Sequence, residues 1–72
     1  MRWELKTEIC TFIIVPYKGE YALYVDDELL QTAESPEAIA DNVFTHTSEF
    51  YEWDVSSLDC EDSLSAWTFF RS

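Results

Sequence analysis

Three segments in the first half of the chain carry the hydrophobic pattern of β-strands. Residues 8–17 are apolar at both odd and even positions, which is typical of a central strand covered on two sides. We expect Pro16 to end this strand, because proline has no N–H to donate to a sheet. Residues 21–25 and 29–33 follow as shorter runs that alternate or mix apolar positions. Three antiparallel strands in chain order predict a meander sheet.

Short polar segments separate these runs. Lys18, Gly19 and Glu20 form the first and are typical of a turn. The second contains three successive acids between two apolar runs, which indicates a β-hairpin, although Asp-Gly would be the stronger signal.

The clearest local signal is a helix start at Ser35. Serine is a favoured N-cap residue, Pro36 suits the first helical position, and Glu37 suits the positive end of the helix dipole. Apolar residues then recur at helical spacing and predict the face that packs on the sheet. That face comprises Ile39, Ala40, Val43, Phe44 and Thr47. We expect the helix to end near residue 47 or 48.

The last third of the chain mixes apolar and acidic residues and gives a weaker pattern. Around Trp53 the sequence is equally consistent with a short strand and with an irregular loop pinned by the indole. Ser63 is expected to cap a single turn that holds Leu64 and Trp67, and residues 68–70 to add an edge strand. The prediction is one α+β domain over residues 1–72: a three-stranded antiparallel meander sheet, one packed helix and a C-terminal segment that adds an edge strand.

Aromatic residues make up 17% of the 72 residues, and so small a domain needs them to build a core. The expected core aromatics are Trp3, Phe12, Trp53, Trp67 and Phe70. The expected exposed ones are Tyr17, Tyr21, Tyr24 and Tyr51. Tyr24 and Tyr51 stand close to carboxylates in the sequence, and tyrosine is enriched at interface hot spots, so both are candidate partner-binding residues.

The net charge is the feature of the composition that says most about function. Fifteen Asp and Glu against four Lys and Arg give a net charge of −11, beyond the range of about 2–8 that solubility requires of a small domain. A disordered acidic segment would be poor in aromatics, which this chain is not. DNA and RNA are poor candidates for direct binding, because their phosphates would be repelled. We therefore expect a basic protein surface as the partner, the alternative being a solvated face that only aids solubility.

The acids fall into local groups. The candidate partner-binding acids are Asp26, Asp27 and Glu28 in the second turn; Glu49, Glu52 and Asp54 after the helix; and Asp59, Glu61 and Asp62 near the C-terminus. Glu34 and Glu37 form a further group whose charge the helix dipole partly uses. Alternate residues of a strand lie about 6.6 Å apart, similar to the step between phosphates along one nucleic-acid strand, so such carboxylates can replace phosphates against Lys and Arg.

Residues that carry enzyme chemistry are few and scattered. Cys10, His46 and Cys60 lack the spacing of a zinc site, and His46 has no identifiable partner as a general base. Gly19 is the only glycine, so no phosphate-binding loop exists. We expect no catalytic residue, metal or cofactor. Two cysteines are a weak disulfide framework, and Cys60 lies between two acids that should raise its pKa. No secretion signal or membrane-length apolar run is present, so we expect a soluble, cytoplasmic protein without membrane contact.

Four stretches resemble small uncharacterised bacterial and prophage proteins: Tyr24-Val25-Asp26-Asp27-Glu28-Leu29-Leu30, Glu34-Ser35-Pro36-Glu37-Ala38, Val43-Phe44-Thr45-His46-Thr47 and Tyr51-Glu52-Trp53-Asp54. In size, acidity and order of elements the chain also resembles phage-encoded anti-CRISPR proteins, several of which block the DNA-binding or PAM-reading surface of a Cascade-type complex. The resemblance implies an acidic DNA mimic in a bacterial host cell, with the large subunit of a CRISPR effector as the favoured target. The alternative is an antitoxin or immunity-type protein that neutralises a basic nuclease.

Overall fold

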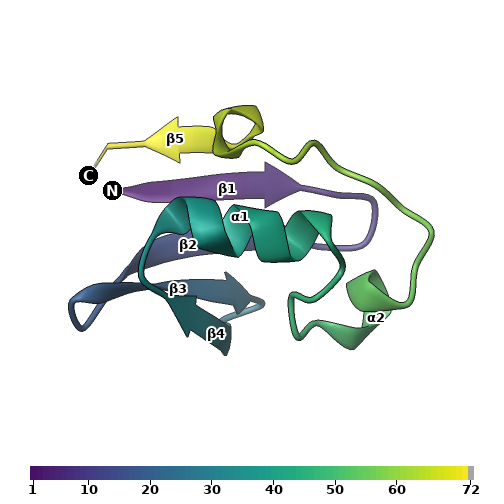
Figure 1. Cartoon of the computed structure of the whole chain (residues 1–72), viewed down its shortest axis with the longest axis horizontal. Coiled ribbons are helices and arrows are strands. Elements are labelled where there is room, and N and C mark those ends of the chain that lie inside the picture. The colour runs from purple at the N-terminus through teal and green to yellow at the C-terminus, as the bar shows by residue number, and fades with distance from the viewer. Residues whose placement is uncertain (72) are drawn as a thin grey trace.

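An antiparallel sheet of five strands organises the computed structural model, which describes residues 1–71 (Figure 1). The strands are β1 (Arg2–Lys6), β2 (Thr11–Tyr17), β3 (Glu20–Val25), β4 (Glu28–Ala33) and β5 (Thr68–Phe70). Their order across the sheet is β4-β3-β2-β1-β5, so the last strand of the chain pairs with the first. The predicted α+β class and the meander of β2, β3 and β4 are confirmed, and the sheet has two more strands than the three predicted as its body.

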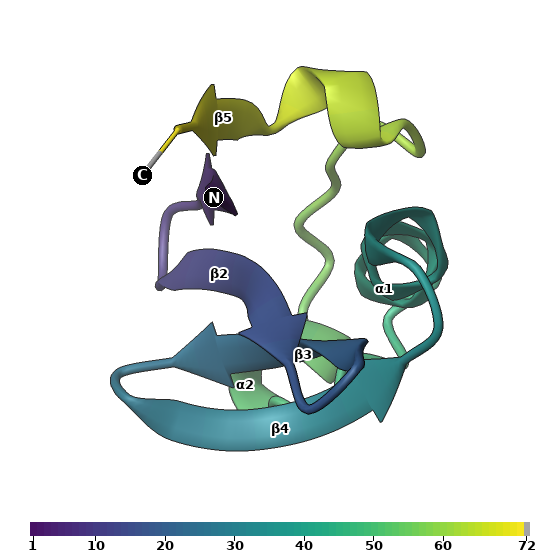
Figure 2. The ribbon, with the colours of Figure 1, turned by 90° about the vertical axis from the view of Figure 1, so that its left-hand side faces the viewer.

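Three helical segments complete the fold: α1 (Pro36–Phe44), α2 (Tyr51–Asp54) and the 3-10 turn η1 (Leu64–Ala66). Helix α1 lies along one face of the curved sheet, and no described helix covers the opposite face (Figure 2). The start of β1 lies beside the end of β5, with which it pairs, whereas α2 and the β1–β2 turn lie at the other end of the long axis (Figure 1).

The core lies between α1 and the sheet. Its buried members are Phe12, Ile14, Leu23, Val25, Ile39, Ala40, Val43, Trp53 and Trp67. Trp53 joins the layers: it is fully buried, its indole N–H donates to the Val43 carbonyl at 2.8 Å, and its ring meets Phe12 edge-on with centroids 5.5 Å apart. The predicted place of Trp53 in the core is therefore confirmed.

The first strand, β1, is the main element that the sequence reasoning missed. Its five residues alternate charged and apolar side chains, and Trp3 and Leu5 pack against the core while Arg2 and Lys6 are exposed. This period of two is the signal of a half-buried strand. It could have been recognised from the sequence.

Strand β2 differs from its prediction at both ends and in its covering. It begins at Thr11 and continues through Pro16, which pairs with Tyr21 of β3. The pairing of β2 with β1 ends at Ile14, so the missing N–H of Pro16 removes no hydrogen bond to β1. Ile13, expected to be covered, lies half-buried on the face that α1 leaves open.

Helix α1 starts as predicted and stops early. The Ser35 hydroxyl accepts from the Ala38 N–H at 3.1 Å, but the helix ends at Phe44. His46 adopts a left-handed φ of 60°, and the Thr47 N–H bonds to the Asn42 carbonyl at 2.8 Å. This is a Schellman ending with histidine where glycine is usual. Thr47 therefore lies beyond the helix and is exposed, and Phe44, the last residue of α1, is exposed as well, although both were predicted to face the core.

The C-terminal third combines confirmed and corrected predictions. Residues 51–54 form the helix α2, neither the strand nor the irregular loop that was expected. The Ser63 cap, which accepts from the Ser65 N–H at 3.1 Å, and the edge strand β5 are confirmed. Phe70, expected in the core, is 37% exposed, and the guanidinium of Arg2 lies 4.6 Å from its ring centroid.

Candidate protein-binding surface

The β3–β4 turn presents two carboxylates in a defined geometry. Asp26 and Asp27 have φ values of 51° and 65°, which is the type I′ conformation of a two-residue hairpin, and Val25 and Glu28 pair across it. All three acids of this turn are exposed. Aspartate tolerates the left-handed region better than most residues, so the turn chemistry and the charge come from the same side chains.

Helix α2 carries a second group of predicted partner-binding residues, and hydrogen bonds to Asp54 hold it in place. The Asp54 carboxylate accepts hydrogen bonds from the Ser48 and Glu49 backbone N–H groups at 3.0 Å each and from the Ser48 hydroxyl at 2.8 Å. Asp54 is thus occupied within the chain. Glu52 and Tyr51 instead point to solvent, and Tyr51 is 73% exposed.

The fold brings the turn, α2 and the β1–β2 turn near one another. The pKa of the Cys10 thiol is raised first by burial and then by the charges of Asp26 and Glu52, while a hydrogen bond with Thr7 lowers it. Two acids from groups 26 residues apart therefore act on one thiol. Sequence spacing alone could not show this convergence, since it depends on where the fold places α2 at the end of the long axis (Figure 1).

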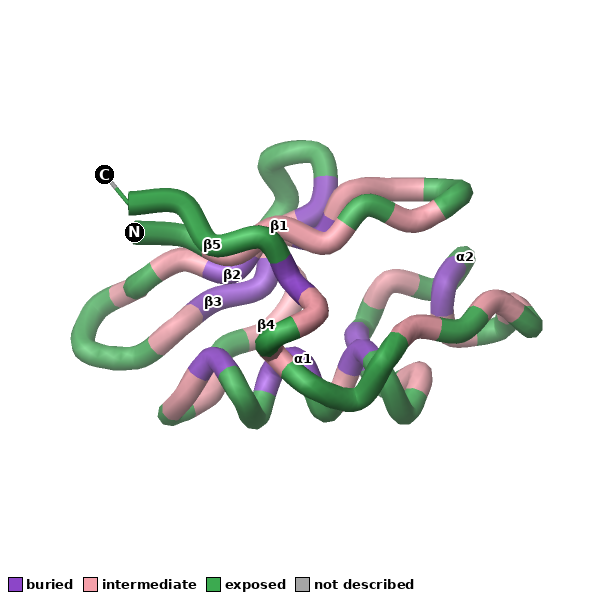
Figure 3. The backbone as a smooth tube through the Cα atoms, turned by 90° about the horizontal axis from the view of Figure 1, so that it is seen from above, coloured by how far each residue is buried: buried purple, intermediate pink, exposed green. Residues whose placement is uncertain are grey.

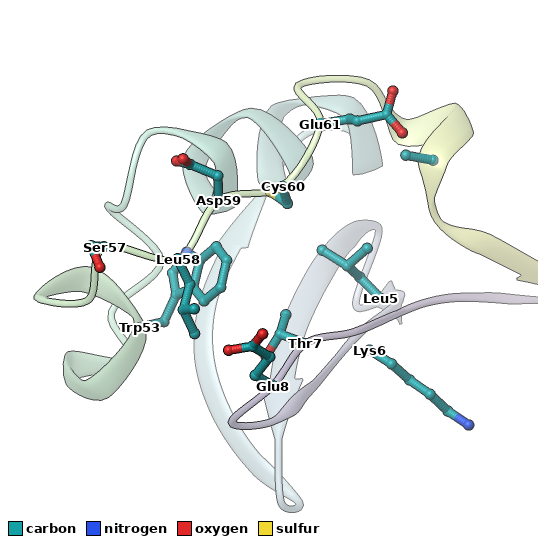
Figure 4. Close-up of a pocket in the computed structure, with 11 residues that line it drawn as sticks. Leu5, Lys6, Thr7, Glu8, Trp53, Ser57, Leu58, Asp59, Cys60 and Glu61 are labelled. Carbon is teal, nitrogen blue, oxygen red and sulfur yellow. The ribbon is translucent and has the colours of Figure 1, made fainter.

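The C-terminal group borders a groove. Asp59 and Glu61 flank Cys60, whose pKa is raised first by burial and then by these two charges. Both acids, together with Glu8 of the β1–β2 turn, line a groove between the end of β1 and residues 57–61 (Figure 4). Asp62 is exposed beside it in sequence. Glu8 was not among the predicted site residues, because its place within an expected strand gave no signal.

We define the acidic end of the molecule as the β1–β2 turn, the β3–β4 turn, α2 and residues 57–62. No Lys or Arg occurs between residues 19 and 70. Of the four cations, Arg2 forms an ion pair with Glu4 at 2.6 Å, and the Lys18 ammonium lies 5.3 Å from the centroid of the Tyr17 ring. The cations therefore belong to β1, the β2–β3 turn and the C-terminus, and Lys6 alone of them borders the groove.

The four tyrosines do not form the exposed set that was predicted. Tyr51 alone is exposed, whereas Tyr17, Tyr21 and Tyr24 are half-buried. Tyr21 packs against the core and meets Trp3 edge-on at 5.9 Å. Tyr24 pairs with Leu29 beside the acidic turn. Tyr51 is thus the aromatic residue best placed to enter a partner.

Other chemistry is sparse in residues 1–71. No group of three His, Cys, Asp or Glu side chains among them could hold a metal ion, and both cysteines are free thiols. His46 stacks on Trp53 with centroids 5.0 Å apart, and its Nε2 lies 2.7 Å from the Leu58 carbonyl. None of the helices in this part of the chain has the length and apolar character needed to cross a bilayer.

No protein-family model matches this chain, and neither a curated protein nor a solved structure matches it.

Proposed function

We propose that this protein is a non-enzymatic inhibitor that binds a basic, nucleic-acid-binding protein surface as an acidic mimic of DNA. The favoured target is the PAM-reading large subunit of a Cascade-type CRISPR effector. The inhibitor would occlude the DNA channel, so target DNA and this protein would compete for one site.

The observation that carries the proposal is the concentration of uncompensated carboxylates at the acidic end. Exposed acids from three segments, Asp26, Glu52 and Asp59 among them, lie in residues 19–70, which contain no Lys or Arg. The ion pair described within residues 1–71 joins Arg2 and Glu4 and involves none of these acids. A field of one sign steers a basic partner during encounter and disfavours other partners. Exposed tyrosine supplies the contact that excludes water once the charges have met, and Tyr51 has that character.

Competition binding tests the proposal. Purified Cascade-type complex is incubated with labelled PAM-bearing duplex and increasing amounts of this protein, at low and at high salt. We expect displacement of the duplex, and weaker binding at high salt because exposed charges are screened beyond about 8–10 Å at 0.10–0.15 M ionic strength. Simultaneous binding of duplex and protein, indifferent to salt, would contradict competitive mimicry.

The same measurement should be made without the complex. The protein alone should not shift labelled duplex DNA or RNA at physiological salt, because it has no basic patch from which to release counterions. If the complex does not bind but a purified basic nuclease is neutralised, the antitoxin or immunity-type function replaces the anti-CRISPR one. The two functions share their electrostatics and differ in the partner.

A further inference from the structure

The groove at the acidic end has the size of a binding site. Its volume is about 640 Å³, within the range of roughly 300–1,000 Å³ found for ligand pockets. One wall is the end of β1 with the β1–β2 turn, and the other is the extended segment of residues 57–61 (Figure 4). The two walls come from opposite ends of the sequence, so the groove exists only in the folded chain.

Apolar side chains line part of the interior of the groove. Side chains alternate along the second wall: Leu58 and Cys60 turn into the groove, whereas the carboxylates of Asp59 and Glu61 point away from it (Figure 4). Leu5 faces them from β1, and the buried Trp53 ring lies behind Leu58. An alkyl chain could pack against Leu5 and Leu58 here.

One carboxylate meets this apolar lining. The side chain of Glu8 is turned toward Leu58 at the mouth of the groove, while Lys6 extends away from it (Figure 4). Within residues 1–71 the Glu8 carboxylate makes no hydrogen bond or ion pair, and the nearby Thr7 hydroxyl already donates to the Cys10 carbonyl at 2.9 Å. Glu8 is therefore free to accept from a ligand.

We infer that this groove is a binding site for an arginine side chain of another protein. The alkyl part of the side chain packs on Leu5 and Leu58, and the guanidinium donates to Glu8. Arginine suits the site better than lysine because its planar guanidinium gives up hydration more easily and donates two parallel bonds to one carboxylate. The inference deepens the proposed function, on which it rests for the kind of partner alone.

Charge complementarity selects this occupant over others. The negative charges of Asp59 and Glu61 make the electrostatic potential around the groove more negative, which disfavours anions and favours a cation. A second copy of this chain is a poor occupant, because it offers four cations against fifteen acids. Arginine is also enriched among the residues that dominate protein interfaces.

Titration with N-acetyl-argininamide, followed by two-dimensional NMR of the ¹⁵N-labelled protein, tests the site without any protein partner. We expect shifts of backbone signals in residues 5–8 and 57–61, and little effect of the neutral isostere N-acetyl-citrullinamide. Glu8→Gln should weaken argininamide binding roughly fivefold or more, since bonds to an ionised acceptor are about twice as strong as neutral ones. The matched control is Glu34→Gln, which removes the same charge from an exposed site at the start of α1 and should change nothing.

Shifts spread over all acidic groups, equal responses to arginine and citrulline amides, equal weakening by the two variants, or no shift at the groove would each overturn the inference. The same variants are then compared for binding to the purified Cascade-type complex. If argininamide occupies the groove and the complex does not bind, the proposed function fails and the arginine site stands. If the complex binds native and Glu8→Gln protein equally, the arginine site fails and the proposed function stands.

Discussion

The carboxylate of Asp54 is bound to both the backbone N–H and the hydroxyl of the buried Ser48, at 3.0 and 2.8 Å. This relationship fixes the connection between α1 and α2 and holds Glu49 at a left-handed φ of 74°. The exposed Tyr51 and Glu52 are thereby carried on a turn that is anchored through Trp53 and Asp54. A short helix of four residues needs such support, because isolated helices of this length are unstable.

Replacing Asp54 with Asn should therefore destabilise the protein. We expect a loss of about 2 kcal/mol in the free energy of unfolding, the scale of hydrogen bonds to an ionised group, because at most one oxygen acceptor remains for three donors. Urea unfolding measures it. Asp59→Asn, which removes the same charge from an exposed side chain, is the control and should change stability little. Equal effects of the two variants would show that net charge, not the Asp54 contacts, is responsible.

Replacing Val43 with Asp should unfold the domain. Val43 is fully buried between α1 and the sheet, and an unpaired carboxylate there has no partner. Circular dichroism with temperature is the measurement, and Ala38→Asp on the exposed side of α1 is the control. A cooperative transition at the native temperature in the Val43 variant would contradict the described packing of α1.

The double change Asp26→Asn and Asp27→Gly should separate charge from fold. Asn-Gly is the preferred pair for a type I′ turn, so the turn should form as well or better, with a gain of up to about 1 kcal/mol where glycine relieves the left-handed strain at residue 27. If these carboxylates contact the proposed partner, affinity should fall although stability rises. A reversal to lysine would confuse the two effects. Unchanged affinity would remove this turn from the contact surface.

Within the proposed mechanism, the hairpin acids should matter more than those at the start of α1. Replacing Glu34 and Glu37 with Gln removes two negative charges, as many as the Asp26 and Asp27 variant removes. These two acids lie at the start of α1, whereas α2 lies beyond its other end (Figure 1). We expect a smaller loss of competition with PAM-bearing duplex from this pair. A larger loss would move the contact surface to the start of α1.

The two thiols should react slowly at neutral pH. Burial is the largest cause that raises the pKa of each thiol, and nearby carboxylates add to it: Asp59 and Glu61 for Cys60, and Asp26 and Glu52 for Cys10. For Cys10 the hydrogen bond with Thr7 lowers the pKa, but the pKa stays raised overall. Raised pKa values mean less thiolate, the reactive form, at any pH below them. Alkylation by iodoacetamide at pH 7.5 should thus be slower in the native protein than in urea, and should accelerate as pH rises. Faster alkylation of the native protein would contradict this environment.

The sequence predicted those features of the fold that depend on interactions between residues close together in the chain. Ser35, Pro36 and Glu37 define the start of α1 through contacts within one turn, and the structure has the expected bond from Ser35 to Ala38. The predicted end of α1, near residue 47 or 48, was wrong because the helix ends where His46 adopts a left-handed conformation that glycine usually adopts. Buried positions recur along α1 (Figure 3), whereas Phe44, Thr45 and Thr47, at and after its end, are exposed.

The sequence by itself determined the excess of negative charge, the α+β class, the hairpin of β3 and β4 and the start of α1. These follow from composition, side-chain alternation and capping, which act over a few residues. Only the tertiary structure decided that β1 and β5 pair, that Asp54 is used within the chain, and that Glu8 and Leu58 face each other across a groove. The pairing of β1 with β5 and the approach of Glu8 to Leu58 each join residues 50 or more positions apart in the sequence. They arise from packing around Trp53 and from the pairing of the first strand with the last. No local pattern encodes which distant side chains such packing brings together.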